Sequence, residues 1–210
     1  MPRISEMTDV DFNGIENPYV PPKILKIASK LKLHQTWDKE VDPVTYEVIR
    51  HNLWQINEEH GATIQRLSGS PVAMYALDLN PSILTEDAEF VYFGPYMQYM
   101  SGVTDTQVKW TLEYRSENPG INEGDMFIAN DPWAGAAHQQ DVMLLCPVFW
   151  EGELFCWITN CLHQYDIGGI TPGSFCPSAE SVYEEGLMLP PLKIIENYEV
   201  RKDIEAVYLR

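Results

Sequence analysis

The tetrad His-Gln-x-Asp occurs twice in the sequence, and its histidines and aspartates are residue types that bind divalent metals. The first copy is His138-Gln139-Gln140-Asp141 and the second is His163-Gln164-Tyr165-Asp166. Imidazole nitrogens and carboxylate oxygens are ligands of zinc, manganese and iron in proteins. The two copies can form one site only if the chain between them brings them together in space.

The sequence between the two copies predicts a β-hairpin. Residues 142–150 and 154–162 are rich in β-branched and aromatic side chains, and Glu151-Gly152 between them is a tight-turn signal. Apolar residues occupy both faces of both segments, which predicts a hairpin buried on both sides. Pro147 has no N–H to donate, so it marks a bulge or an edge.

The register of this hairpin decides which side chains meet. If Trp150 pairs with Leu154, Asp141 pairs with His163, whereas a two-residue turn shifts that partner by one residue. Directly opposed side chains in an antiparallel pair have Cβ atoms about 4.5–5.5 Å apart. His138 lies three residues before Asp141, in the loop that leads into the first strand, and can fold over the same point.

We therefore expect His138, Asp141 and His163 to converge at the open end of the hairpin. Two imidazoles and one carboxylate suit a divalent metal that keeps a coordination position open for water or substrate. Zinc is the first expectation and manganese the second, although the ligand set also accepts iron. A histidine–aspartate hydrogen bond that ties two loops together would place the same residues in the same way, so both interpretations stay open.

Composition and charge narrow the classes of function. The chain has 210 residues, with 14 basic and 31 acidic side chains and a net charge of −17, which argues against binding to nucleic acid or to an anionic membrane. No run approaches the ~20 apolar residues that span a bilayer, and the first residues lack the apolar core of a secretory signal. The cysteines show no CxxC spacing. Reduced thiols in a cytoplasmic protein are the expectation.

Residues 1–40 are expected to form an N-terminal arm that docks on a subunit. Within it, residues 21–34 predict a short basic amphipathic helix, with its apolar stripe at Ile24, Ile27, Ala28 and Leu31. On so acidic a protein, this helix is expected to pack against its own domain or a neighbouring subunit rather than a membrane.

A long helix is expected to follow over residues 43–67. Asp42 is a good N-cap, Pro43 suits the first helical position, and residues 68–71 (SGSP) end the helix. His51 and His60 have no second ligand at helical spacing, so we interpret them as residues of the polar face or the core edge. The apolar stripe of this helix is Val44, Val48, Leu53, Ile56, Ile64 and Leu67.

The remaining pattern completes an α+β fold. We expect short strands over residues 72–100, a helix over 104–114, a strand over 126–129 that ends at Asn130-Asp131-Pro132, a loop after 168 and an amphipathic C-terminal segment. The predicted architecture is a long N-terminal helix packed on a mixed, largely antiparallel sheet with a buried central hairpin.

Six ordered blocks between residues 130 and 193 resemble the hydantoinase B family. They are Asn130-Asp131-Pro132, Gly135-x-x-His138-x-x-Asp141, Pro147-Val148-Phe149, His163-x-x-Asp166-x-Gly168, Pro172-Gly173-Ser174 and Glu185-Gly186-Leu187-x-x-Pro190-Pro191-x-Lys193. A weaker likeness covers residues 42–67. The resemblance implies that residues 41–210 are the N-terminal part of a hydantoinase B-type catalytic domain, with further sequence expected beyond it.

The resemblance also implies a metal at His138, Asp141 and His163. Asp166 is then either a group that orients an imidazole or a cap on the Ile167-Gly168-Gly169 turn. Members of the family work with a hydantoinase A-type subunit that uses ATP, and this chain has no G-x-x-x-x-G-K-[ST] loop of its own. Other subunits of a hetero-oligomer are expected as partners.

The function that the resemblance favours is that of a subunit of an ATP-dependent, biotin-independent ketone carboxylase, with a ketone and bicarbonate as substrates. The family's histidine-rich motifs are missing from residues 90–102, and Gln164 stands where hydrolytic members often have histidine, so a cyclic amidase is the alternative. A non-catalytic assembly subunit is the third hypothesis. Either an apolar substrate pocket or ordinary core packing explains an aromatic cluster: Tyr92, Phe93, Tyr96, Met97, Tyr99 and Met100.

Overall fold

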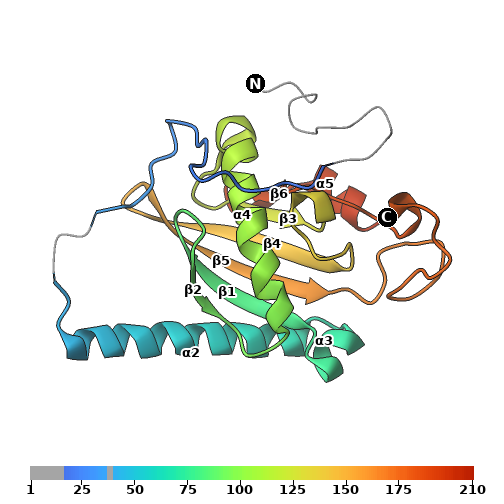
Figure 1. Cartoon of the computed structure of the whole chain (residues 1–210), viewed down its shortest axis with the longest axis horizontal. Coiled ribbons are helices and arrows are strands. Elements are labelled where there is room, and N and C mark those ends of the chain that lie inside the picture. Colours follow the sequence, from blue (N-terminus) through green and yellow to red (C-terminus); the bar gives the residue numbers. More distant parts are fainter. Residues whose placement is uncertain (1–16, 37–39) are drawn as a thin grey trace.

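The computed structural model describes residues 17–36 and 40–210, which fold as an antiparallel sheet with helices on both faces (Figure 1). The sheet has seven strands in the order β2-β1-β5-β4-β3-β6-β7, and all its strand pairs are antiparallel. The predicted α+β class is confirmed. The elements are α2 (Pro43–Leu67), α3 (Pro71–Ala76), β1 (Leu79–Thr85), β2 (Phe90–Phe93), η1 (Gln98–Met100), α4 (Ser101–Arg115), η2 (Ser116–Gly120), β3 (Met126–Ala129), η3 (Pro132–Ala134), β4 (Asp141–Trp150), β5 (Glu153–His163), η4 (Val182–Glu184), β6 (Leu192–Glu196), β7 (Glu199–Val200) and α5 (Lys202–Tyr208).

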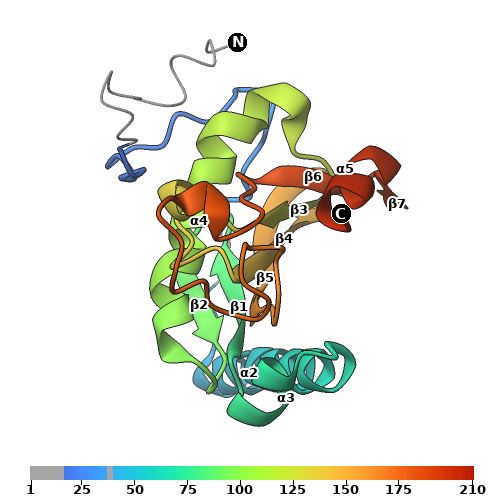
Figure 2. The same ribbon diagram turned by 90° about the vertical axis from the view of Figure 1, so that its right-hand side faces the viewer.

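The main core lies between α4 and one face of the sheet. Figure 2 shows α4 on one side of the strands and α5 on the other. Side chains alternate between the two faces along each strand, so neighbouring residues enter different cores. Phe127 joins the α4 core, whereas Ile128 joins the core under α5. The α4 core is built from Leu84, Val108, Leu112, Phe127, Met143, Leu145, Trp157 and Cys161.

The central hairpin forms with the predicted strands. Its register combines the two predicted alternatives, which were a two-residue turn and the pairing of Asp141 with His163. Trp150 pairs with Glu153 across a two-residue turn, and the register then shifts between Val148 and Phe149. This bulge adds one residue to β5, so that Asp141 pairs with His163 at the other end. The bulge lies close to Pro147, where the sequence predicts a bulge or an edge, but its extra residue belongs to β5 and Pro147 itself pairs with Trp157.

Helix α2 is confirmed, but it does not pack through the stripe that its sequence predicts. Asp42 caps it by accepting hydrogen bonds from the backbone N–H groups of Val44 and Thr45. The buried residues are Asn57 and Gly61, because the small glycine lets the helix approach the ring of Tyr96. Leu53 and Ile64 are half-buried, whereas four members of the predicted stripe are exposed: Val44, Val48, Ile56 and Leu67.

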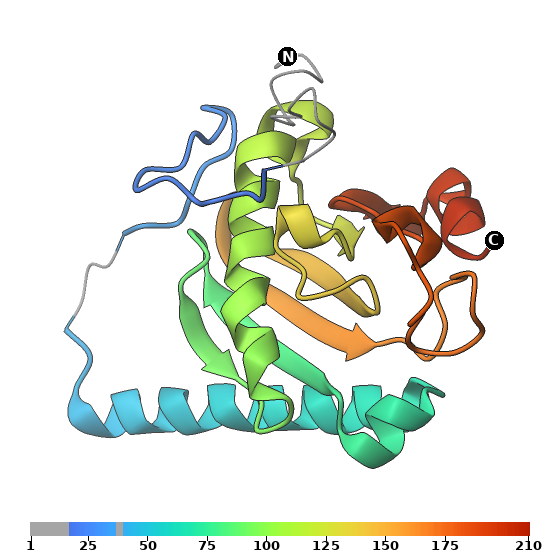
Figure 3. The same ribbon diagram turned by 45° about the vertical axis from the view of Figure 1, so that its right-hand side comes forward.

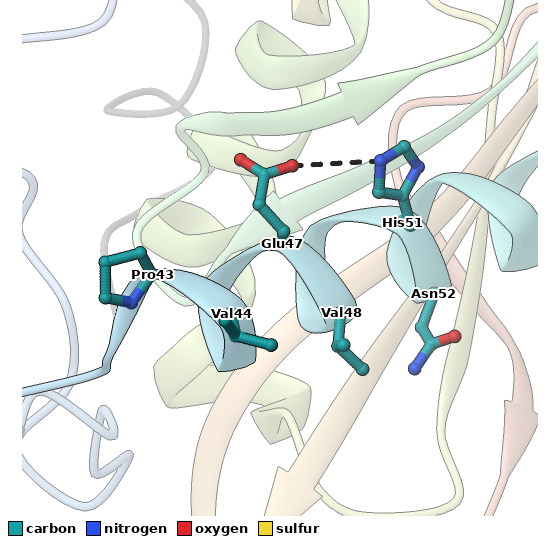
Figure 4. A pocket seen from close by; sticks show the side chains of 6 residues that line it. All are labelled: Pro43, Val44, Glu47, Val48, His51 and Asn52. Carbon is teal, nitrogen blue, oxygen red and sulfur yellow. Dashed lines mark ion pairs between the residues drawn. The ribbon is translucent and has the colours of Figure 1, made fainter.

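The outer side of α2 carries a shallow apolar hollow (Figure 4). Val44 and Val48 line it together with Pro43 and Asn52. His51 forms an ion pair of 3.7 Å from Nε2 to an oxygen of Glu47 on the same surface, which fits its interpretation as a residue of the polar face. The sheet therefore holds α2 by one narrow face and leaves apolar side chains outside.

The predicted amphipathic helix over residues 21–34 is wrong. This segment runs as extended chain and turns, because its backbone donors find partners on α4, η2 and β5. The N–H of Lys26 donates to Glu113 and that of Ala28 to Ser116, while Leu33 forms a parallel bridge with Leu154. The expected docking on the protein's own body holds for residues 17–36, whereas docking on another subunit stays a prediction. The rest of the predicted arm, at residues 1–16 and 37–39, lies outside the described residues.

Two other segments differ from their prediction. Residues 71–76 form helix α3 rather than a strand, because Ser70 caps it by accepting a hydrogen bond from the N–H of Ala73. Strands β6 and β7 were not predicted, and they extend the sheet beyond β3. The strand over 126–129 is confirmed, as is the helix over 104–114, which extends to residues 101–115. Among the described residues, no helix is long and apolar enough to cross a membrane.

Lys193 in β6 forms a buried ion pair that joins this added edge to the turn before β3. Its Nζ lies 2.8 Å from Asp125 Oδ2, and both side chains are 1% exposed. The other oxygen of Asp125 accepts the N–H of Asn197, and Oδ2 also accepts that of Asn122. A carboxylate at this depth depends on the lysine for compensation of its charge.

We predict that Lys193→Met lowers the free energy of unfolding by about 3–5 kcal/mol, because it leaves the Asp125 carboxylate buried without its partner. Urea denaturation followed by circular dichroism measures this change. Lys202→Met is the matched control, since Lys202 pairs with Glu205 at the surface and should matter little. Equal stability of the two variants would contradict the prediction.

Candidate metal centre

The hairpin places Asp141 and His163 directly opposite each other on the α4 face of the sheet. They are paired residues of β4 and β5. Met143 and Cys161, which lie two residues away on the same strands and therefore on the same face, belong to the α4 core. Asp141 is 0% exposed and His163 is 2% exposed. Figure 3 shows this end of β5, with α4 in front of the sheet and the following loop beside the strand.

His138 reaches the same point from the loop before β4. Its carbonyl oxygen accepts the N–H of Asp141 at 3.2 Å, which closes a turn and brings the two side chains together. The Nε2 atom lies 3.2 Å from Asp141 Oδ2, and the ring centroids of His138 and His163 are 5.0 Å apart. One potential ligand atom from each of the three predicted residues lies within 4.8 Å of the others.

Asp78 is a fourth group of the centre that the sequence analysis missed. It precedes β1, and its carbonyl oxygen accepts the N–H of His163 at 3.1 Å. Its Oδ2 lies 3.4 Å from His163 Nδ1, while Asp141 Oδ1 lies 3.3 Å from the same nitrogen. Asp78, His163 and Asp141 therefore form a row across three adjacent strands, with the imidazole between two carboxylates. The pairing of Leu79 with Leu162 sets this row, and it could be found only by aligning β1 with β5.

Tyr99 in η1 was expected either in a pocket or in the core, and it contacts the two carboxylates of the row. Its hydroxyl donates to Asp141 Oδ2 at 3.1 Å and lies 3.5 Å from Asp78 Oδ1. The other members of the aromatic cluster differ from it. Met100 is in the α4 core, Met97 packs against that core, and Tyr96 packs against Leu79 and Leu162. Core packing thus accounts for these three, and only Tyr99 reaches the centre.

Burial and mutual contact shift the pKa values of the groups in the row. Burial disfavours the charge of Asp141, but the neighbouring imidazoles of His138 and His163 outweigh it and lower its pKa. Burial also disfavours the imidazolium of His138, yet Asp141 and Gln140 raise its pKa overall. The pKa of Asp78 is raised by burial, partly opposed by His163 and reinforced by Asp141.

Two buried atoms at the centre of the row make no hydrogen bond. Asp141 Oδ1 and His163 Nδ1 approach each other without hydrogen-bond geometry, and both are shielded from solvent. Buried polar atoms without partners are costly, and they mark places where an ion or water binds. An imidazole nitrogen, a carboxylate oxygen and a second imidazole suit zinc, manganese or iron. The residues present therefore fit a divalent metal, which stays a prediction.

Asp166 does not contact any of these groups through its side chain. Its Oδ1 accepts the N–H of Gly168 at 2.8 Å, and its Oδ2 accepts that of Gly173 at 3.0 Å. Of the two roles that the sequence left open, the contacts favour the cap on the turn over the orientation of an imidazole. The loop that Asp166 closes carries Phe175, whose ring centroid lies 6.1 Å from that of His138 and 5.7 Å from that of His163.

Comparison with known proteins identifies relatives of this fold. The model of the Hydantoinase B/oxoprolinase family matches residues 42–210. The chain is 33% identical to 5-oxoprolinase 1 of Arabidopsis thaliana over 155 residues, which cover 74% of this chain and 12% of that protein. It is 30% identical to the acetophenone carboxylase delta subunit of Aromatoleum aromaticum, covering 81% of this chain and 24% of that subunit.

A solved structure agrees with these matches. The ATP-dependent caprolactamase of Pseudomonas jessenii superposes with a TM-score of 0.73 at 28% identity, covering 81% of this chain and 29% of the other. The chain thus spans less than a third of the length of these relatives. The match covers α2 and the whole sheet, including the row of charged residues.

Removing both imidazoles tests the ligand set. We predict that purified protein carries about one equivalent of a divalent metal and that His138→Ala/His163→Ala loses it, because the variant lacks both imidazole ligands and the carboxylates that are left hold such an ion far less tightly. Elemental analysis by plasma mass spectrometry measures the content. His51→Ala is the matched control, since His51 lies on the surface of α2. A stoichiometric amount of metal in the double variant would contradict the assignment of His138 and His163 as ligands.

The shifted pKa values predict how metal binding depends on pH. The raised pKa of His138 gives the metal-free protein stability that is lost as pH rises through that value, and the lowered pKa of Asp141 gives stability that is lost as pH falls through its own. Metal binding requires a neutral imidazole. The rise in melting temperature on adding Zn²⁺ should therefore be larger at pH 8 than at pH 6. An equal rise at both pH values would contradict this expectation.

Proposed function

Because the chain belongs to the hydantoinase B/oxoprolinase family, we propose that it is the metal-containing subunit of an ATP-dependent, biotin-independent ketone carboxylase of the acetophenone or acetone type. The observation that carries the proposal is the buried row of Asp78, His163 and Asp141, completed by His138. It supports the binding of a divalent metal beside an acid–base group. The similarity to the acetophenone carboxylase delta subunit supports the choice of reaction.

In the assembled enzyme, this subunit would receive an activated ketone from a hydantoinase A-type partner that uses ATP. The partner would trap the enol form as a phosphate ester. Cleavage of its P–O bond by water would release phosphate and return the enolate, whose carbon would attack CO2 formed by dehydration of bicarbonate to give a β-keto acid. No biotin is required, and further subunits complete a cytoplasmic hetero-oligomer. The chain covers 24% of the carboxylase subunit that it resembles, so the proposal concerns the activity of the assembled enzyme.

His138, Asp141 and His163 would hold the metal, with zinc expected first and manganese second. When bound, a divalent ion acts as a Lewis acid that stabilises negative charge on a substrate oxygen. Tyr99 can donate a hydrogen bond at the edge of the centre, where 45% of the residue is exposed. The pKa of Asp78 is raised, mainly by burial, and its carboxylate lies beside His163, so it is the candidate group for accepting or releasing a proton at the centre.

ATP-coupled ring opening of a cyclic amide is the second candidate function. The identity to 5-oxoprolinase 1 and the structural match to caprolactamase favour it. The same ligands would then lower the pKa of a bound water to about 7 and make a nucleophile. A third possibility, an assembly subunit without chemistry, is disfavoured because a vestigial site would have no reason to keep His138, Asp141 and His163 in contact.

Turnover by the assembled enzyme distinguishes these functions. With ATP, acetophenone or acetone and labelled bicarbonate, we expect label in a β-keto acid and a loss of at least about 10²-fold in the His163→Ala enzyme. The His51→Ala enzyme serves as control. Ring opening of hydantoin, 5-oxoproline or caprolactam with ATP but without bicarbonate would replace the carboxylase by the amidase. ATP-dependent activity that survives His163→Ala would overturn both.

A further inference from the structure

The second ring nitrogen of His163 is held by a serine of the loop that follows β5. The Nε2 atom of His163 is hydrogen-bonded to the hydroxyl of Ser174. The opposite nitrogen, Nδ1, faces Asp141 Oδ1 and Asp78 Oδ2. His163 is 2% exposed, so its two ring nitrogens face these protein groups and not solvent.

The loop around Ser174 is built so that its hydroxyl arrives at this nitrogen. The carboxylate of Asp166 closes a short loop, because its two oxygens accept hydrogen bonds from the N–H groups of Gly168 and Gly173. Gly168 and Gly173 have φ values of 83° and 107°, a region that side chains rarely adopt. Ser174 follows Gly173 directly. The position of its hydroxyl therefore depends on the two hydrogen bonds that Asp166 accepts in this loop.

The far end of the loop is fixed as well. The N–H of Ile170 donates to Glu184, and the N–H of Leu187 donates to the carbonyl oxygen of Ile167. The segment is thus tied to itself at both ends.

We propose that Ser174 is a positioning residue that fixes the tautomer and orientation of His163. If Nε2 carries the proton and donates it to Ser174 Oγ, then Nδ1 keeps its lone pair for an ion beside Asp141. Hydrogen-bond partners on the far nitrogen of a ligating histidine set its tautomer in this way. Asp166 supports the same histidine indirectly, through the loop. This inference rests on the metal centre proposed above.

Metal affinity tests the inference without any substrate. We expect Ser174→Ala to weaken the binding of Zn²⁺ by about 10–100-fold, measured by competition with a fluorescent chelator. Ser174→Thr keeps the hydroxyl and should restore binding to within a few-fold. Ser178→Ala is the matched control, because Ser178 lies in the same loop and its hydroxyl contacts Thr171. The melting temperature of metal-free Ser174→Ala should fall by only a few degrees, because the variant loses one hydrogen bond to a buried nitrogen.

The tautomer of His163 gives a readout that loop folding alone would not move. In the Zn²⁺-bound protein at pH 8, ¹⁵N spectra of labelled histidine should show His163 protonated at Nε2, and Ser174→Ala should mix in the form that is protonated at Nδ1. Asp166→Ala should weaken Zn²⁺ binding in the wild type but add little in the Ser174→Ala background.

Unchanged Zn²⁺ affinity in Ser174→Ala would overturn the inference, and so would a Ser174→Thr variant as weak as Ser174→Ala. Failure of the metal centre itself looks different, because His138→Ala/His163→Ala would then keep its metal. If that double variant loses the metal while Ser174→Ala binds normally, the centre stands and the positioning role falls.

Discussion

The pairing of two carboxylates with one imidazole across three strands is the constraint on which the rest of this structure depends. Asp141 is fully buried, and a carboxylate at that depth is stable only with compensating charge or hydrogen bonds. His138 Nε2 lies 3.2 Å from one of its oxygens, and His163 Nδ1 lies 3.3 Å from the other without hydrogen-bond geometry. Asp78 brings a second carboxylate to the same imidazole. If one of the two histidines is uncharged, the two carboxylates carry more negative charge than the histidines neutralise. A divalent cation would remove that imbalance.

Strand register turns this electrostatic requirement into a geometric one. A slip of one residue between β4 and β5 would move His163 away from Asp141 and place a neighbour of the opposite sheet face there. The two-residue turn at Glu151-Gly152 alone gives the slipped register, and the bulge after Leu154 corrects it. The irregularity lies at the far end of the hairpin from the centre. Its effect on the centre is carried by an unbroken ladder, so the bulge belongs to the site even though it touches none of its residues.

The sequence was sufficient for the elements whose determinants are local. Asp42, Pro43 and the following helical run predict α2, and the spacing within the hairpin predicts that His138, Asp141 and His163 lie together. Asp78, Tyr99 and Ser174 could not be found in this way, because each reaches the centre through pairing or folding of distant segments. Residues 21–34 have helical periodicity, yet their N–H groups donate to Glu113 and Ser116 instead. Tertiary hydrogen bonds there outweigh a weak local preference.

The two copies of His-Gln-x-Asp show how the same residues take different roles when the backbone differs. In the first copy a turn brings the histidine back over the aspartate, and the aspartate begins a strand with its side chain in the core. In the second copy the histidine ends a strand, and the aspartate has left the sheet to bind two glycine N–H groups. The second aspartate then acts on the centre only by shaping the loop that carries Ser174. Backbone context, not residue identity or spacing, separates a group that faces the metal centre from a group that holds its surroundings in place.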